Sequence, residues 1–182
     1  VTLNEDIITV PAGVSSFTVI IPTTNDTIDE SNETISLSIG GVTTTSTIED
    51  NDSAPTISSI TSESETEGNN LVHTVTLSNE SSVATTFSFT GTPTFSNGVT
   101  LSSGNITVPA GVTSFTVTIP TINDLIDEVN ETIDITIDGL TATGTIIDND
   151  GVPTITSVTS DSETEGTDLV HTVTLSNESA VA

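Results

Sequence analysis

Acidic side chains are the residues of this chain whose types and spacing could do chemistry, and they gather in three short stretches. The stretches are "SESETEG" (62–68), "NDLIDEVNE" (123–131) and "DND" (148–150). Ca²⁺ takes six to eight hard oxygen ligands of this kind, whereas Mg²⁺ takes fewer protein ligands and keeps several waters. None of the stretches holds the thiolate or imidazole that favours Zn²⁺ or copper. We therefore expect a Ca²⁺ site, and the alternative is that the stretches are ordinary solvated loops.

The charge balance excludes several classes of partner. The 182 residues include 26 Asp and Glu but no Lys or Arg, which gives a formal charge of -26. Binding to nucleic acid or to anionic lipid has no electrostatic basis in such a chain. So large a charge of one sign loads the compact state with repulsion, which metal ions or salt must relieve. We predict no nucleic-acid partner.

Other missing features point the same way. The chain has no Cys, so it can form neither disulfides nor thiolate metal sites. A small extracellular module without disulfides needs another staple, and a metal ion is a common one. No apolar run approaches the roughly 20 residues of a membrane helix. We expect an extracellular or cell-surface protein that does not insert into membranes.

The residues offer little to an enzyme. Both histidines, His73 and His171, stand at equivalent positions among alternating apolar residues, where we expect a hydrogen-bonded, partly buried His. Paired acids could serve a glycosidase. One unit copied along an array, without Trp or Tyr, argues against that activity. We predict neither catalysis nor a small-molecule substrate.

The sequence of the chain repeats itself at a fixed period. "VPAGVSSFTV" at Val10 returns as "VPAGVTSFTV" at Val108, and "HTVTLSNES" at His73 returns at His171, both with a period of 98 residues. Internal repeats at a fixed period indicate a tandem array. We place one complete repeat at 53–150, the C-terminal half of a preceding repeat at 1–52 and the N-terminal part of a following repeat at 151–182.

The repeat is predicted to be all-β. Apolar residues alternate with polar ones in "LVHTVTL" (71–77), "SFTVTIP" (114–120), "ETIDITI" (131–137) and "LTATGTI" (140–146). A period of two indicates strands with one buried face. About seven strands in 98 residues is typical of an Ig-like Greek-key β-sandwich. The fold class is therefore tandem Ig-like (Calx-beta-like) sandwiches.

The acidic stretches also carry a family resemblance. "NDLIDEVNETIDITI" followed by "GTIIDND" resembles the Calx-beta pattern, and "ETEG" resembles the Glu-Gly near that family's first strand. The whole repeat looks still more like the tandem extender repeats of giant bacterial RTX-type adhesins, among them an ice-binding adhesin. In those proteins Ca²⁺ at the domain junctions stiffens a string of sandwiches.

The resemblance implies a ligand from each stretch and leaves Asp127 facing solvent. Asn123 and Asn149 stand where Calx-beta domains often have acids, which implies fewer or weaker ions, near 10⁻⁴–10⁻³ M as in other extracellular modules. The implied ligands are Glu65, Glu67, Asp124, the Ile126 carbonyl, Glu128, Glu131, Asp148 and Asp150. Their equivalents in the flanking half-repeats are Asp26, Glu30, Glu33, Asp50, Asp52, Glu163 and Glu165.

The function expected from these features is mechanical. A Ca²⁺-stiffened array would space an adhesive tip from a cell, and its partners would be the neighbouring repeats of the same array. An alternative is a subunit of an extracellular matrix filament, in which residues 1–52 and 151–182 complete one sandwich between two molecules by strand addition. A ligand-binding lectin module is a third class, which would need a concave polar site beyond the acidic loops.

Overall fold

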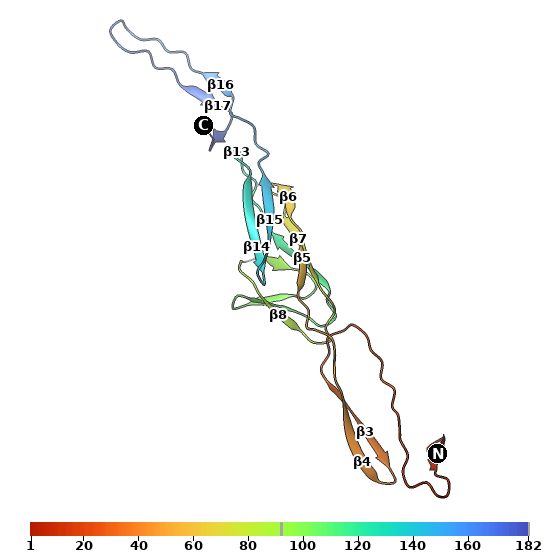
Figure 1. Cartoon of the computed structure of the whole chain (residues 1–182). Helices are drawn as coiled ribbons and strands as arrows, with labels where there is room; N and C mark the ends of the chain where they lie inside the picture. Colours follow the sequence, from red (N-terminus) through yellow and green to blue (C-terminus); the bar gives the residue numbers. More distant parts are fainter. Residues whose placement is uncertain (92, 182) are drawn as a thin grey trace. The chain divides into compact units, whose positions relative to one another are not determined.

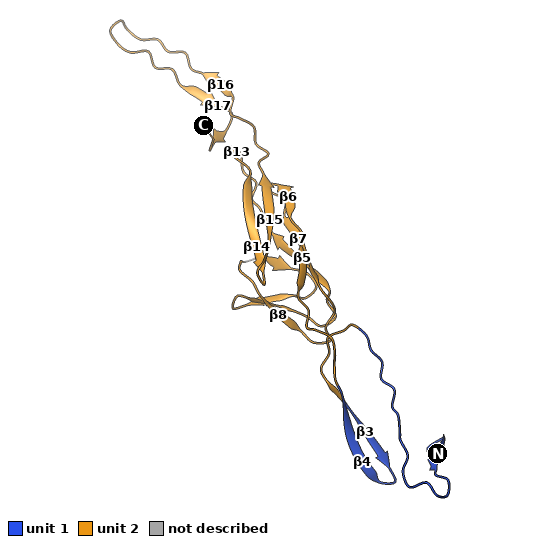
Figure 2. Cartoon of the chain, viewed as in Figure 1, with its two compact units in different colours: residues 1–26, 34–48 blue, residues 27–33, 49–182 orange. Residues whose placement is uncertain are grey.

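The computed structural model describes residues 1–91 and 93–181, and these contain strands and connecting loops but no helix. The predicted all-β class is therefore confirmed. Among the described residues there is no helix long and apolar enough to cross a bilayer. Two compact units divide the chain: residues 1–26 with 34–48, and residues 27–33 with 49–182 (Figure 2).

The complete repeat lies in the second unit (Figure 1), and its strands other than β13 belong to two layers. One layer is a four-stranded sheet in the order β5-β7-β12-β9. The other contains the three-stranded sheets β14-β15-β6 and β10-β11-β8, which meet at a bridge between Phe89 and Ile137. The strands are β5 (Ile57–Ile60), β6 (Glu63–Thr66), β7 (Leu71–Leu77), β8 (Thr85–Ser88), β9 (Thr94–Phe95), β10 (Thr100–Ser102), β11 (Asn105–Val108), β12 (Ser114–Ile119), β13 (Ile126–Asp127), β14 (Glu131–Ile137) and β15 (Leu140–Ile147).

The alternating segments of the sequence form the strands predicted from them. β7 buries Leu71, His73, Val75 and Leu77 and turns the residues between them outward. β12 pairs with β7 in register, with Phe115 opposite Val75, so both strands present their apolar side chains to the same interior. Period-two patterning predicted these faces because successive side chains of a strand point to opposite sides.

Apolar side chains from both layers form one core. Phe115 and Val117 of β12 pack with Phe87 of β8, Ile106 of β11 and Ile137 of β14. Phe95 extends this core, with its ring centroid 5.3 Å from that of Phe89 in an edge-to-face pair and 6.3 Å from that of Phe115. This contact between facing sheets is what makes the repeat a sandwich.

The described part of 53–150 holds more strands than the expected seven. The opening segment divides after Ile60: β5 pairs antiparallel with β7 in one layer, and β6 pairs parallel with β15 in the other. The hydrophobic pattern could not show this division, because residues 57–66 contain only two apolar residues, Ile57 and Ile60, and the remainder are Ser, Thr or Glu. The division matters because it carries the first acidic stretch to the end of β15.

The flanking segments leave exposed the faces that the complete repeat buries. Residues 151–181 contain β16 (Ile155–Val158), β17 (Val173–Leu175) and β18 (Glu178–Ser179). Leu169 is 58% exposed, whereas its equivalent Leu71 is fully buried. The second layer of a sandwich is absent from this segment, so these side chains have little to pack against.

The first unit has two hairpins, of β1 (Thr2–Asn4) with β2 (Ile7–Thr9) and of β3 (Glu33–Ile39) with β4 (Val42–Ile48). Residues 16–21, equivalent to β12, form no strand, and Phe17 is 40% exposed. β12 is held by β7 and β9, and residues 1–52 contain no counterpart of either strand. The predicted boundaries at 52/53 and 150/151 stay a prediction.

Burial predicts very different effects for two equivalent phenylalanines. Phe115→Ala should lower the free energy of unfolding of the second unit by about 3–5 kcal/mol, the usual cost of emptying a buried aromatic site. Phe17→Ala, the matched control, should cost under about 1 kcal/mol because Phe17 is already half-exposed. Urea unfolding of the full chain, followed by circular dichroism, measures both. Equal losses in the two variants would contradict the described core.

Candidate metal site

Parallel pairing of β6 with β15 brings two distant acidic stretches together. Ile147, at the end of β15, pairs with Thr66, at the end of β6, and the Glu67 amide donates to the Ile147 carbonyl at 3.0 Å. Both strands end at the same edge, so Glu67 and the "DND" triplet leave the sheet side by side. The register of these two strands thus brings together acidic residues that lie about 80 positions apart in the sequence.

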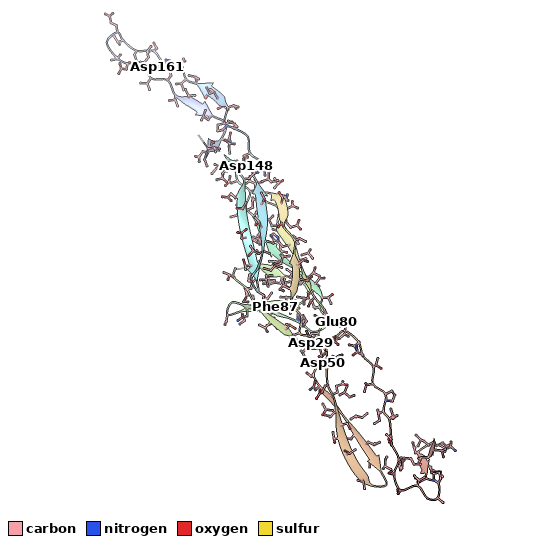
Figure 3. The ribbon with its side chains drawn as sticks, viewed as in Figure 1. Asp29, Asp50, Glu80, Phe87, Asp148 and Asp161 are labelled. Atoms are coloured by element: carbon pink, nitrogen blue, oxygen red, sulfur yellow. The ribbon has the colours of Figure 1, made fainter. Side chains whose placement is uncertain are left out.

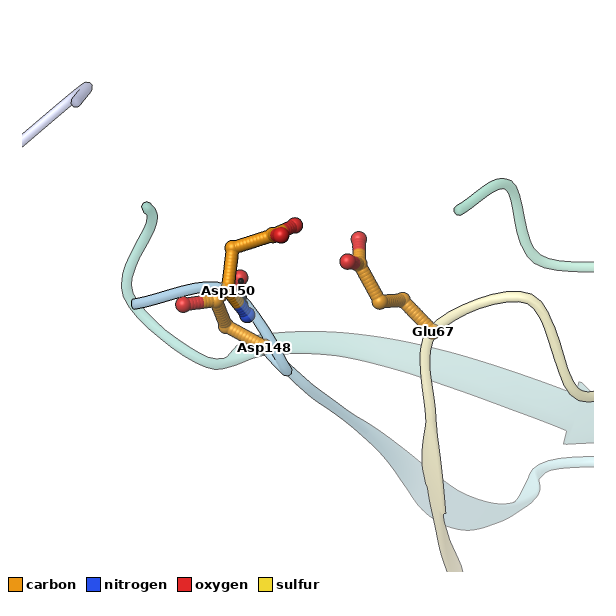
Figure 4. A group of neighbouring side chains, drawn as sticks. All are labelled: Glu67, Asp148 and Asp150. Carbon is orange, nitrogen blue, oxygen red and sulfur yellow. Dashed lines mark hydrogen bonds between the residues drawn. The ribbon is translucent and has the colours of Figure 1, made fainter. Parts of the chain in front are cut away.

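Glu67, Asp148 and Asp150 form the tightest acidic cluster among the described residues. One carboxylate oxygen from each lies within 4.8 Å of the others. Glu67 is only 7% exposed, and the two aspartates are half-buried. Figure 4 shows the Glu67 and Asp150 carboxyl groups pointing toward each other across the gap between the two strand ends.

Two oxygens of this cluster are buried without a hydrogen-bond donor, Glu67 Oε1 and Asp150 Oδ2. An unpaired buried polar atom is costly, and a charged one more so. The chain has no Lys or Arg that could pair with these groups. Either a proton shared between the two carboxyl groups or a bound cation would satisfy both oxygens.

The second acidic stretch lines a pocket beside the cluster. The pocket encloses about 280 Å³. Its walls include Asp124, Glu128 and Glu131 together with Glu67 and Asp148. Five of the predicted ligands thus face one space, and all their donor atoms are oxygens of the type that Ca²⁺ prefers. These residues fit the predicted ion.

Backbone amides hold the loops in place around this space. The Glu128 amide donates to Asp148 Oδ2 at 3.2 Å, and the Asp148 amide donates to Asn130 Oδ1, also at 3.2 Å. The Ile126 amide donates to Asp124 Oδ1 at 2.8 Å. Asn130 thereby acts as a tie between the second and third stretches, a role that its place in the sequence did not suggest.

Asn123 and Asn149 hold the loops together from the other side. Asn149 Nδ2 donates to Asn123 Oδ1 at 2.9 Å. Two acids at these positions would repel, whereas two amides can pair, because an amide offers both a donor and an acceptor. Gly68 lies against the same spot: a Cβ there would come 2.8 Å from Asn123 Cβ, and its φ of +81° favours glycine.

Crowding raises the pKa of two carboxyl groups. Burial is the main cause for Glu67, followed by the carboxyl group of Asp150 and the charges of Asp124 and Asp148, and all of them favour its protonated form. Burial also raises the pKa of Glu128, with further contributions from Asp124, Glu131 and Asp148. A nearby cation would oppose both shifts, because an opposite charge favours the ionised form of a carboxyl group.

The other predicted ligands lie apart from the cluster. Glu65 is exposed on β6. Ile126 lies in β13 and pairs with Glu178 of β18. Asp127, expected to face solvent, does not: it is 8% exposed, and its Oδ2 accepts a hydrogen bond from Ser179 Oγ at 2.7 Å. The expectation failed because its partner lies 52 residues away.

The preceding half-repeat has the same loop ties. The Glu30 amide donates to Asp50 Oδ2 at 3.1 Å, the Asp50 amide to Asn32 Oδ1 at 3.0 Å and the Asp52 amide to Asp50 Oδ1 at 3.4 Å. Asp26 and Glu33 are exposed, as are Glu163 and Glu165 of the following segment. The scaffold of the site therefore recurs with the sequence period.

Both histidines are hydrogen-bonded as predicted, but His73 is fully buried where partial burial was expected, and the equivalent His171 is exposed. The Nδ1 atom of His73 lies 2.7 Å from the Thr61 carbonyl oxygen, which can only accept, so Nδ1 is the donor of this hydrogen bond. Nε2 is buried without a partner and faces Gly144, where a Cβ would come within 3.0 Å of it. The imidazole therefore fills the space that the glycine leaves between the two layers.

Comparisons with known proteins give little further information. No protein-family model matches the chain, and no curated protein does. Among solved structures, domains 4 and 5 of the S-layer protein SbsC align at 20% identity over 65% of this chain and 57% of that chain, with a TM-score of 0.28. At so low a TM-score the match supports no argument about this protein. The resemblance to Calx-beta domains and adhesin extenders stays a prediction.

The raised pKa values predict how stability depends on pH in calcium-free buffer. The folded state binds protons more tightly than the unfolded state, so the free energy of unfolding should fall as pH rises from about 4.5 through the raised folded pKa values of Glu67 and Glu128. At pH values above these two raised pKa values, the stabilisation from the bound protons is fully lost. Urea midpoints between pH 4.5 and 8 measure this slope.

A single variant separates this effect from the general charge of the chain. Glu67→Gln removes the most buried of these groups and should flatten the slope, whereas Glu65→Gln, at an exposed position of the adjoining strand β6, should leave it unchanged. A slope that is the same in all three proteins would show that Glu67 is not the group responsible.

Proposed function

We propose that the complete repeat binds Ca²⁺ at the cluster of Glu67, Asp148 and Asp150, and that the chain is a structural, non-enzymatic segment of an extracellular or cell-surface stalk. The observation that carries this proposal is the pair of buried oxygens without a donor in a chain without Lys or Arg. A divalent cation would neutralise the cluster and connect the first, second and third acidic stretches.

The position of the cluster supports the mechanical part of the proposal. Asp148 and Asp150 are the last residues before the segment Gly151–Pro153 leads into the following repeat. An ion held there would restrain the start of that segment as well as the end of β15. Repeats that contact mainly their neighbours then add length in proportion to their number. We propose that such an array spaces an adhesive tip from the cell that bears it.

Calcium should raise the melting temperature of the full chain. Anything that binds only the folded state stabilises it by mass action. With a dissociation constant of about 10⁻⁴–10⁻³ M, 10 mM Ca²⁺ should raise the midpoint by roughly 3–10 °C over the chelated protein. Differential scanning calorimetry measures this shift.

Two matched variants test the assignment of the ligands. Glu67→Gln should abolish most of the calcium shift without lowering the midpoint in chelator, because it also removes a repulsive charge. Glu65→Gln should keep the full shift. Coincident melts with and without Ca²⁺ in the unaltered chain would disprove the metal site, and equal shifts in both variants would disprove the role of Glu67.

A second candidate function is a subunit of a self-assembling filament, and the exposed faces of the flanking segments favour it. Phe17 and Leu169 occupy positions that are buried as Phe115 and Leu71 in the complete repeat. Residues 1–52 of one molecule could therefore complete the sandwich that residues 151–182 of another begin.

Sedimentation velocity of the 182-residue chain distinguishes the two candidates. A filament subunit should show a weight-average mass that rises with concentration far above 18.6 kDa. Phe17→Ser should abolish this rise, and the exposed-site control Ile122→Ser should not. A mass that stays at the monomer value up to about millimolar concentration would remove the filament candidate.

A further inference from the structure

The same pair of side chains meets at two places in the second unit, one sequence period apart. Ser81 Oγ donates to Asp29 Oδ2 at 2.6 Å, and Ser179 Oγ donates to Asp127 Oδ2 at 2.7 Å. In each pair the aspartate comes from the second acidic stretch of one repeat, and the serine comes from the "SNES" segment of the next. Neither the metal site nor the core accounts for this contact.

Backbone hydrogen bonds fix each pair in place. The Ser82 amide donates to the Asp29 carbonyl at 2.8 Å, and the Ala180 amide donates to the Asp127 carbonyl at 2.9 Å. Both contacts are parallel β-bridges, between Asp29 and Ser81 and between β13 and β18. Figure 3 labels Asp29 and Glu80 close together, and the Asp29 amide donates to the Glu80 carbonyl at 3.0 Å.

One partner of each pair is buried, while Ser179 is exposed and Asp29 is half-buried. Asp127 and Ser81, which both belong to the complete repeat, are 8% and 4% exposed. A hydroxyl donating to a carboxylate at 2.6–2.7 Å is a charge-assisted hydrogen bond, among the shorter and stronger kinds. The loss of one partner would leave the other polar group buried without compensation.

The serine segment is itself anchored to its own repeat and to the linker before it. The Gly111 amide donates to the Ser81 carbonyl at 2.9 Å. Asn79 Nδ2 donates to the Ser53 carbonyl at 2.8 Å, and the Thr56 amide donates to Ser78 Oγ at 3.0 Å. Asn177 and Ser176 make the same bonds to Gly151 and Thr154 in the following segment. The serine segment is therefore hydrogen-bonded to the linker before its repeat, to the sandwich of its own repeat and to the acidic loop of the preceding repeat.

We propose that Ser78–Ser82 and its equivalent 176–180 are a docking surface for the acidic loop of the preceding repeat, latched by the Asp127–Ser179 and Asp29–Ser81 pairs. The partner of this surface is another repeat of the same chain. The latch uses none of the ligands assigned above and does not depend on metal binding. It restrains the acidic loop of one repeat against the serine segment of the next.

Amide hydrogen exchange in the full chain, measured by NMR in one fixed buffer, tests the latch. The Ala180 and Ser82 amides should be protected from exchange, because each donates a hydrogen bond to a carbonyl of the preceding repeat. Ser179→Ala should speed exchange at Ala180 about tenfold or more and leave Ser82 unchanged. Ser81→Ala should do the reverse. Each joint thus serves as the control for the other.

Two further variants guard against general loosening of the C-terminal segment. Ser179→Thr keeps the hydroxyl and should keep Ala180 protected, and Ser162→Ala, exposed on the same segment, should change nothing. Unprotected Ala180 and Ser82 amides in the unaltered chain, or unchanged protection in both alanine variants, would overturn the proposal. Because no calcium step enters this measurement, its result is separate from that of the metal site.

Discussion

The structure depends on one electrostatic constraint: carboxylates must meet at a strand end in a chain that has no Lys or Arg to pair with them. The parallel register of β6 and β15 leaves Glu67 no other position than beside Asp148 and Asp150. Packing fixes β15, because a slip of one residue would turn its inward-facing Ala142 to the outside. β6 has no buried side chain and is placed by its parallel pairing with β15. Backbone pairing at the ends of β6 and β15 thus holds like charges close together against their repulsion.

The loop from Asn123 to Glu131 serves both ends of this arrangement. Asp124, Glu128 and Glu131 face the pocket beside the cluster, and Asp127 between them faces the following repeat. A short β-bridge at Ile126–Asp127 allows one loop to present acids in two directions. The charge of this segment is therefore divided between a site open to a cation and a contact already satisfied by a serine hydroxyl. Stiffness of an array would then have two sources at each joint.

The sequence predicted what depends on local pattern. β7, β12, β14 and β15 follow from alternation, and burial of His73 follows from its place among Leu71, Val75 and Leu77. It also predicted that three acidic stretches would converge, although only the pairing of β6 with β15 shows why Glu67, and not Glu65, enters the cluster. Asp127 was misjudged because nothing near it in the sequence marks Ser179 as its partner. Asn123 and Asn149 were read as missing acidic ligands, and Asn130 was given no role. The side-chain amides of all three tie the loops by hydrogen bonds between residues 18 or more positions apart.

A crystal of the chain grown in Ca²⁺ and measured for anomalous scattering tests the central claim most directly. The account predicts an anomalous peak within coordination distance of Glu67, Asp148 and Asp150, at about 2.3–2.6 Å from their oxygens. An empty cluster, with Glu67 and Asp150 joined by a shared proton at neutral pH and millimolar Ca²⁺, would contradict it.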